Sequence, residues 1–340
     1  MEPDATDEQT DGPPLQQPLR LLPGVIIVVL QWLVRFVIPA LVWEFTPMGA
    51  LGGFLGWLAI LVWWGFFSRA PSRDRWGAVV FMFAAMAATM LVLDDSIAKA
   101  MNGMIFVLYF APFLSLAFVL WAVTSRHLAD GPRRATMFAT ILLVCVAWTL
   151  IRLDGMVFSE GAEFSWRWTE TSEERLLALA GATPPVGIGS SGTGTSGLIW
   201  PGFRGPERNS IVRDLQIVTD WSTSPPVELW RRPIGPGWSS FAANGDLFYT
   251  QEQRGDHELV VCYSLISGEL VWRHRDGTRF WEAIGGPGPR ATPTLHDGRV
   301  YTFGATGVLN VLDGGDGTAV WTRNVAADIG AEIPTWGLSS

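Results

Sequence analysis

Long apolar runs separated by short polar breaks fill the chain from residue 21 to residue 151. A helix needs about 17–25 predominantly apolar residues to cross a bilayer, and five runs reach that length. Arg35 and Pro39 interrupt the first run, whereas the other four hold no charged residue. We therefore predict five membrane-spanning helices. Their ranges are Leu21–Trp43, Gly49–Phe67, Gly77–Leu93, Gly103–Val123 and Ala135–Ile151.

The positions of the arginines predict how this bundle is oriented, because cytoplasmic loops retain Lys and Arg. The loops after the second and fourth spans hold three arginines each, and the other loops hold no basic residue or only Lys99. The arginine-rich loops should be cytoplasmic, so residues 1–20 form an acidic cytoplasmic tail and everything after Ile151 lies outside. We predict a multi-pass protein of a bacterial inner membrane, with the lipid bilayer as its first partner and a periplasmic C-terminal part. The six arginines are Arg69, Arg73, Arg75, Arg126, Arg133 and Arg134.

Arg35 is the one charge well inside a predicted span, where charged side chains are costly and often functional. The simpler interpretation is that it snorkels to the interface or faces a neighbouring helix. No predicted span contains a histidine, so the bundle has no ligands for a bis-histidine haem. We expect residues 21–151 to act as an anchor.

A juxtamembrane segment and linker follow at residues 152–197. The sequence Thr171-Ser172-Glu173-Glu174 before two leucines is typical of a short capped helix. Residues 181–197 contain only uncharged residues rich in Gly, Ser, Thr and Pro, which is the composition of a flexible tether. A separate domain should therefore occupy residues 198–340.

Within that domain, strand patterns repeat at intervals of about 50 residues. The segment Gly237–Thr250 is echoed by Gly288–Thr302, and each reads as a strand, a tight turn and a strand. Each is followed by two further short apolar strands, Leu259–Leu265 with Glu269–His274, and Val308–Leu312 with Thr318–Arg323. Four strands in about 40–50 residues is the pattern of a β-propeller blade. The predicted fold class is an N-terminal α-helical membrane bundle followed by a C-terminal all-β partial propeller with four-stranded blades.

The third and fourth strands of each unit carry a motif. Residues 262–272 contain Gly268 and Trp272, and residues 311–321 contain Asp313, Gly317 and Trp321. These residues, with Trp230 in the lead-in segment, resemble the tryptophan-docking motif of pyrroloquinoline-quinone-like (PQQ-like) propellers. The resemblance implies that Gly makes the hairpin turn and that Trp packs between neighbouring blades. The first copy has Ser264 where the family pattern has Asp.

The length available does not match a whole propeller of this family, which has seven or eight blades. Residues 198–340 have room for about three blades at ~45 residues each, and the chain stops inside a repeat unit. Stacked repeats bury their apolar faces only against neighbours. We therefore expect the sequence to be a fragment or truncated product of a longer protein, with assembly of several arcs into a ring as the alternative.

Composition adds two exclusions. Charged residues make up 16% of the chain, and apolar residues make up 49%, with 18 Trp. The net charge of −8 arises entirely after residue 152, where 22 acids face 14 bases. No basic stripe is present, so nucleic acid is not an expected partner. The four histidines have no second ligand at metal spacing, so no zinc site is predicted.

Two functions are compatible with these patterns. The first is a non-catalytic periplasmic module that binds or scaffolds a periplasmic or membrane protein, without cofactor. Its candidate binding loops hold Arg254–Glu258 and Arg279–Glu282, with Arg279 and Trp281 having the chemistry of interface hot spots.

The alternative is part of a membrane-bound quinoprotein dehydrogenase that oxidises sugars or alcohols, since membrane glucose dehydrogenase of that family resembles this layout. It would require PQQ and calcium, and such enzymes often have an adjacent Cys pair. This chain has only the distant Cys145 and Cys262, and Cys262 reads as a buried strand residue. Whether the protein is an enzyme is left open by the sequence, with the non-catalytic interpretation favoured and no catalytic residue assigned.

Overall fold

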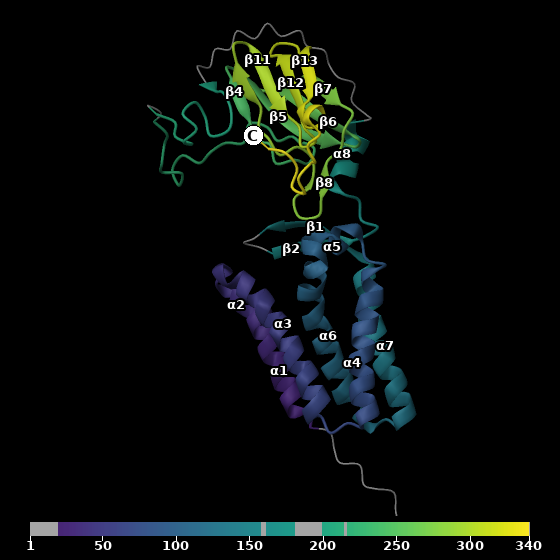
Figure 1. Cartoon of the computed structure of the whole chain (residues 1–340). Coiled ribbons are helices and arrows are strands. Elements are labelled where there is room, and N and C mark those ends of the chain that lie inside the picture. The colour runs from purple at the N-terminus through teal and green to yellow at the C-terminus, as the bar shows by residue number, and fades with distance from the viewer. Residues whose placement is uncertain (1–19, 158–160, 181–198, 214–215, 340) are drawn as a thin grey trace, which may run out of the picture. The chain divides into compact units, whose positions relative to one another are not determined.

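The computed structural model describes residues 20–157, 161–180, 199–213 and 216–339, which fall into two compact units. The first unit contains the helices up to Arg152 together with Val157–Ala162, and the second contains Leu153–Met156 and the chain from Glu163 onward. Figure 1 shows the first unit as packed helices and the second as antiparallel sheets. The predicted acidic tail and the predicted tether at 181–197 lie outside the described residues.

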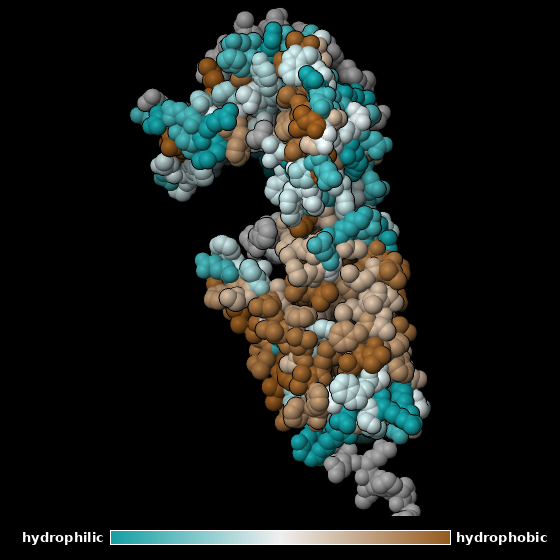
Figure 2. All heavy atoms as spheres, in the orientation of Figure 1, coloured by the Kyte–Doolittle hydropathy of each residue, from teal (hydrophilic) through white to brown (hydrophobic). Residues whose placement is uncertain are grey.

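The helical unit follows the apolar runs closely, because a chain without alternating polarity and with few breakers satisfies its backbone hydrogen bonds best as a helix in an apolar setting. Figure 2 shows hydrophobic side chains covering much of the visible face of these helices. The α-helices are α1 (Leu22–Trp32), α2 (Ile38–Leu41), α3 (Thr46–Val62), α4 (Ser72–Met90), α5 (Asp95–Ala98), α6 (Met104–Thr124) and α7 (Asp130–Thr149). Tighter or wider turns extend them as η1 (Leu33–Val37), η2 (Trp43–Phe45), η3 (Trp63–Phe67), η4 (Ala100–Gly103) and η5 (Ser125–His127).

Three helical stretches in the described chain are long and apolar enough to cross a membrane: Leu22–Leu41, Trp43–Phe67 and Ala100–His127. By length and hydropathy, the structure therefore supports three of the five predicted spans. The third and fifth runs do form helices, α4 and α7, but each helix begins with charged residues and ends before or near the end of the apolar run. The apolar part that remains helical is too short by itself. The charged residues are Arg73, Asp74 and Arg75 in α4 and Asp130, Arg133 and Arg134 in α7.

The interruption predicted in the first run appears as a change of helix type. Pro39 cannot donate a backbone hydrogen bond and its ring crowds the carbonyl of Arg35, so the preceding turn widens. Residues Leu33–Val37 form a π-helical turn, and the N–H of Ile38 bonds to Leu33. Arg35 is buried, with its guanidinium 4.4 Å from the ring centre of Tyr109 on α6. It therefore faces a neighbouring helix, as the simpler interpretation predicted.

Between the bundle and the repeats, a two-stranded sheet forms from β1 (Ile151–Val157) and β2 (Gly161–Trp166). The predicted short helix follows as α8 (Ser172–Ala180). Its cap has the reciprocal geometry expected from the sequence: Thr171 Oγ1 accepts from the N–H of Glu174, and Glu174 Oε2 accepts from the N–H of Thr171.

The second unit contains two four-stranded antiparallel blades, at the positions that the repeat predicted. In each, strands adjacent in sequence pair with each other. The first blade is β4 (Ala242–Asn244), β5 (Leu247–Arg254), β6 (His257–Ser264) and β7 (Leu270–Asp276). The second is β10 (Thr294–His296), β11 (Arg299–Phe303), β12 (Val308–Asp313) and β13 (Ala319–Asn324), followed by α9 (Val325–Ile329). A short pair, β8 (Trp281–Glu282) and β9 (Gly286–Pro287), connects them.

The expected third blade equivalent is not formed by the described residues. The lead-in segment Val227–Arg232 pairs with no neighbouring strand of the described chain, and Val227 and Leu229 are largely exposed. Residues 199–201, which precede the lead-in segment, bond to both blades. The strand β3 (Ile199–Trp200) adds to the edge of β4, and the carbonyl of Pro201 accepts from the N–H of Leu295 on β10.

The core of the second unit consists of apolar residues at alternating strand positions. One cluster lies between the two blades and joins β5, β6 and β7 to β11 and β12 through Tyr249, Val260, Cys262, Trp272, Val300 and Leu312. Cys262 is fully buried, as predicted, and burial raises the pKa of its thiol to about 12. This interface fixes the two blades against each other, and the sites described below depend on it.

Candidate functional site

The docking motif joins consecutive blades. The indole N–H of Trp272, on β7, donates to the carbonyl of Gly314 in the β12–β13 hairpin, at 3.0 Å. The face of the same ring lies against Gly317, which has φ +74° and leaves no room for a Cβ atom. Asp313 shapes this hairpin, because its Oδ1 accepts from the N–H of Gly315 at 2.8 Å. Glycine is required at position 317 by both the turn and the ring.

The same contact is repeated one blade earlier. Trp230 donates from Nε1 to the carbonyl of Leu265, at 2.9 Å, and its ring covers Gly268, which has φ +70°. A Cβ atom at Gly268 would lie 2.6 Å from the Trp230 ring. Trp321 is at the equivalent position of the second blade, where 45% of its surface is exposed. Trp230 and Trp272 thus cover the glycines of the following turns, and Trp321 presents its ring at the outer face of β13.

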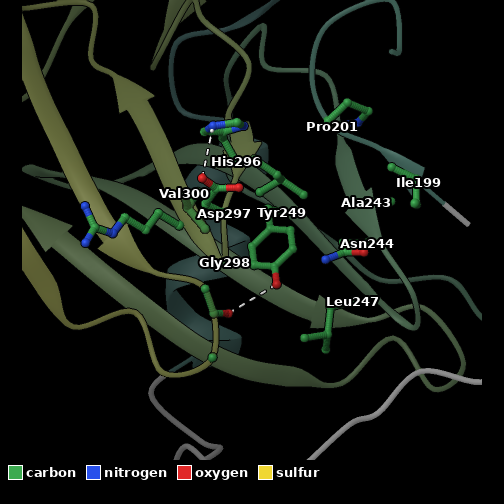
Figure 3. Close-up of a pocket in the computed structure, with 14 residues that line it drawn as sticks. Ile199, Pro201, Ala243, Asn244, Leu247, Tyr249, His296, Asp297, Gly298 and Val300 are labelled. Atoms are coloured by element: carbon green, nitrogen blue, oxygen red, sulfur yellow. Dashed lines mark hydrogen bonds and ion pairs between the residues drawn. The ribbon is translucent and has the colours of Figure 1, made fainter.

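A cavity of about 400 Å³ opens between the two blades, at the end that holds the β4–β5 and β10–β11 turns (Figure 3). Its walls are mostly apolar, and Tyr249 crosses it to donate to the carbonyl of Gly314 at 3.1 Å. His296 and Asp297 lie at its exposed rim, with His296 Nε2 3.3 Å from Asp297 Oδ2. The Tyr249 hydroxyl is already hydrogen-bonded, and a few polar groups lie at the mouth of the cavity. The cavity can therefore hold a small ligand or an extended peptide segment. The apolar wall comes from Ile199, Pro201, Ala243, Leu247, Leu295 and Val300.

The sequence interpretation missed this cavity. Its polar residues belong to hairpin turns whose Asn-Gly and Asp-Gly sequences are explained by turn geometry alone. Only the packing of the two blades brings the turns together.

On the other side of the inter-blade core, polar groups are buried together. Asn310 on β12 donates to Asp276 on β7 at 2.7 Å, and His274 Nε2 lies 3.4 Å from the Asp276 carboxylate. Glu258 is 3% exposed and accepts from the N–H of Ala305. Burial raises the pKa of Glu258 to about 7, and the negative charge of Asp276 adds to the rise. The hydrogen bond from Asn310 to Asp276 thus joins the two blades, and Glu258 is the buried carboxyl of this group with a raised pKa.

These buried groups do not amount to a metal centre. Throughout the described chain, no group of three His, Cys, Asp or Glu side chains is arranged to hold a metal ion. The two cysteines of the chain are both free and buried.

The loops proposed as a binding surface are partly engaged by the chain itself. Arg279 forms a bidentate ion pair with Glu173 at the start of α8, with distances of 2.8 and 2.9 Å. This hydrogen-bonded pair raises the pKa of the Arg279 guanidinium. Glu173 also accepts from the N–H of Gly255, at 2.8 Å, in the turn between β5 and β6. Trp281 is 37% exposed and pairs in register with Pro287.

The comparison with known families covers the repeats. Residues 221–334 match the family described as outer membrane protein assembly factor BamB. The matched range contains both blades and every docking residue from Trp230 to Trp321. The PQQ-like resemblance found in the sequence is confirmed over this range. No curated protein matches the chain.

Proposed function

We propose that this protein is a membrane-anchored binding or scaffold module, in which PQQ-like blades present their loops outside a bacterial inner membrane. The observation that carries the proposal is the docking of Trp272 on Gly314 and Gly317, and of Trp230 on Leu265 and Gly268. The Trp272 contact joins the two blades, and the Trp230 contact joins the lead-in segment to the first blade, so the three parts form one platform. A rigid platform with loops at its ends is suited to recognition of another protein.

For the anchor, we propose that α4 and α7 cross the membrane together with the three strongly apolar stretches. If only three stretches crossed, the loop with Arg126, Arg133 and Arg134 would lie outside, against the tendency of arginines to remain cytoplasmic. Both arrangements place the blades outside when the N-terminus is inside, so the loop around Arg126 is the position that distinguishes them.

Cysteine labelling tests the topology. Cys145 and Cys262 are buried, so new cysteines at Arg126, Lys99 and Ser267 can be probed with a membrane-impermeant maleimide in intact spheroplasts. Five spans predict labelling at 267 and 99 without lysis, and at 126 only after lysis. Labelling at 126 but not at 99 in intact spheroplasts would establish three spans instead. Labelling at 267 only after lysis would overturn the proposed orientation.

The function itself is tested at the loops. A photo-crosslinking residue in place of Asp256 or Trp281 should form a discrete adduct with a membrane or periplasmic protein in living cells. The same residue in place of Asp316, in the β12–β13 hairpin at the other end of the blades, is the control. Adducts that do not depend on the loop position would contradict the proposal.

The enzymatic alternative has its own assay. Full-length protein is incubated with PQQ and Ca²⁺ and tested with sugars and alcohols in the presence of an artificial electron acceptor. Turnover that depends on both additions would replace the scaffold proposal by the dehydrogenase. No turnover, together with loop-specific adducts, supports the scaffold.

A further inference from the structure

One N–H donor in the β5–β6 turn and two on Arg279, just after β7, converge on one carboxylate. The N–H of Gly255 and one guanidinium nitrogen of Arg279 both contact Glu173 Oε1 at 2.8 Å, and the other nitrogen contacts Oε2 at 2.9 Å. The Glu173 side chain is 13% exposed and that of Arg279 is 34% exposed. A planar fork matched to a carboxylate, with a backbone donor beside it, is a strong and geometrically selective anion receptor.

Contacts within the β5–β6 turn and the loop after β7 position these donors, and none of these contacts involves α8. Gly255 has φ +57°, which the tight turn between β5 and β6 requires. Gln253 is fully buried and donates to the carbonyls of both Gly255 and Thr278, at 3.0 and 3.1 Å. It thereby holds the Arg279 loop beside the turn. Arg279 also donates to the Gly255 carbonyl. The donors are therefore preorganised for a carboxylate.

Within the described part of the chain, the contacts of α8 with this site centre on Glu173. The helix α8 has nine residues, which is too short for stable helicity in isolation. Leu176 of α8 is 7% exposed, and Leu177 Cδ1 lies 3.8 Å from the position that a Cβ atom would take at Gly255. Figure 1 shows α8 beside the first blade. A contact of one ion pair and two leucines is small enough to exchange.

We propose that Gly255 and Arg279 form a carboxylate-binding site for a short acidic helix, which α8 occupies in cis and a partner protein occupies in trans. The inference deepens the proposed function, because it names the ligand chemistry of the loop face and makes α8 its autoinhibitory occupant. A partner must present a glutamate or aspartate near the start of an amphipathic helix, followed by leucine-like side chains, as Glu173 and Leu176 do.

The charge around the site favours a carboxylate over a phosphate group. The hydrogen bond to Glu173 raises the pKa of the Arg279 guanidinium, and the nearby negative charge of Asp256 adds to the rise. One cation beside one fixed carboxylate can accept a monoanion, whereas a dianionic phosphate would meet Asp256 without a second cation to compensate it.

The test uses the full chain in detergent and a fluorescent peptide corresponding to residues 168–180, whose binding is measured by anisotropy. In the wild type, the tethered α8 competes at an effective concentration in the millimolar range, which should weaken peptide binding by at least about tenfold. The substitution Glu173→Lys repels Arg279 and releases α8, so this variant should bind the peptide at least about tenfold more tightly than the wild type. Glu170→Lys makes the same charge change at an exposed position and should leave peptide binding at the wild-type level.

Specificity is tested on both partners. Adding Arg279→Lys to Glu173→Lys keeps the charge but removes the fork, and should weaken peptide binding by about tenfold. In the peptide, Glu173→Gln should abolish most of the binding, whereas Glu170→Gln should not, and this comparison needs no further change to the protein. Absence of peptide binding to the Glu173→Lys chain, or equal binding of the two peptides, would overturn the inference. PQQ-dependent turnover would overturn the proposed function while leaving these binding results unchanged.

Discussion

The ring of Trp272 covers Gly317, and its N–H donates to the carbonyl of Gly314, so one side chain of the first blade contacts both ends of the hairpin turn in the second. In the sequence, 42 residues and the strands β8 to β12 separate Trp272 from Gly314. The contact is therefore a property of stacked blades and not of either blade alone. It also determines which substitutions the repeat region should tolerate.

Replacing Gly317 with Ala should destabilise the blades by about 2–4 kcal/mol, because the new methyl group meets the Trp272 ring and the backbone must hold φ at +74°. Gly277→Ala is the matched control: a Cβ atom there meets no heavy atom within 4 Å. Thermal unfolding of the full chain, followed by calorimetry, measures both. Equal transitions for the two variants would show that the tryptophan does not rest on Gly317.

Trp272 and Trp321 occupy the same repeat position but should respond differently. Trp272→Ala removes a ring that is 7% exposed and should cost about 3–5 kcal/mol. Trp272→Phe loses mainly the hydrogen bond to Gly314 and should cost less, with about 1 kcal/mol from that bond. Trp321→Ala should cost under about 1 kcal/mol, since its ring is 45% exposed. Urea unfolding gives the three differences, and a large loss at Trp321 would mean that a further element covers it.

Stability should fall as the pH rises from about 4 to about 7, because of Glu258. Burial raises the pKa of its carboxyl to about 7 in the folded protein, whereas an unfolded glutamate titrates near 4.3. In this window the folded state keeps the proton and the unfolded state releases it, so ionisation favours unfolding by up to about 3 kcal/mol. Below the window both states are protonated, and the contribution of Glu258 is fully present.

The measurement compares wild type with Glu258→Gln at pH 5 and pH 7.5 by urea unfolding. The variant should lose most of this pH dependence, and Glu269→Gln, at an exposed turn, should keep it. Asp276 and Arg290 also act on Glu258, and His274 lies beside Asp276, so the difference between the two proteins isolates the effect of Glu258. An unchanged slope in Glu258→Gln would contradict the assignment.

In the helical unit, Gly24→Ala should lower the stability of the protein and Gly77→Ala should not. A Cβ atom at Gly24 on α1 would lie 2.6 Å from the ring of Trp63, which is 2% exposed and bonded to the Arg20 carbonyl. We expect a loss of about 1–3 kcal/mol. Gly77 on α4 has nothing within 4 Å of its Cβ position, so alanine should be neutral or stabilise the helix by up to about 1 kcal/mol. Thermal unfolding in detergent orders the two variants.

Local patterns determined much of this architecture. The apolar runs predicted the helices, and the Gly turns with β-branched strands predicted both blades and the spacing from Gly268 and Trp272 to Gly317 and Trp321. The capping box at Thr171 and Glu174 was also predicted correctly. These features depend on hydrogen bonds and side-chain contacts between residues close in sequence, which a sequence pattern can report. The first turns of α4 and α7 are charged and lie before the apolar runs. The length of an apolar run therefore did not indicate where these two helices begin.

Only the tertiary structure decided the candidate sites. Glu173 and Arg279 are both ordinary charged residues of a sequence, and neither indicates the other across the linker and a whole blade. Glu258 lies at the start of β6, whose sequence does not say which face a second blade will cover, and the pKa of Glu258 depends on that burial. The cavity around Tyr249 likewise exists because two blades pack against each other. Contacts between distant elements depend on how whole sheets stack, and that information is distributed over the fold rather than held in any one segment.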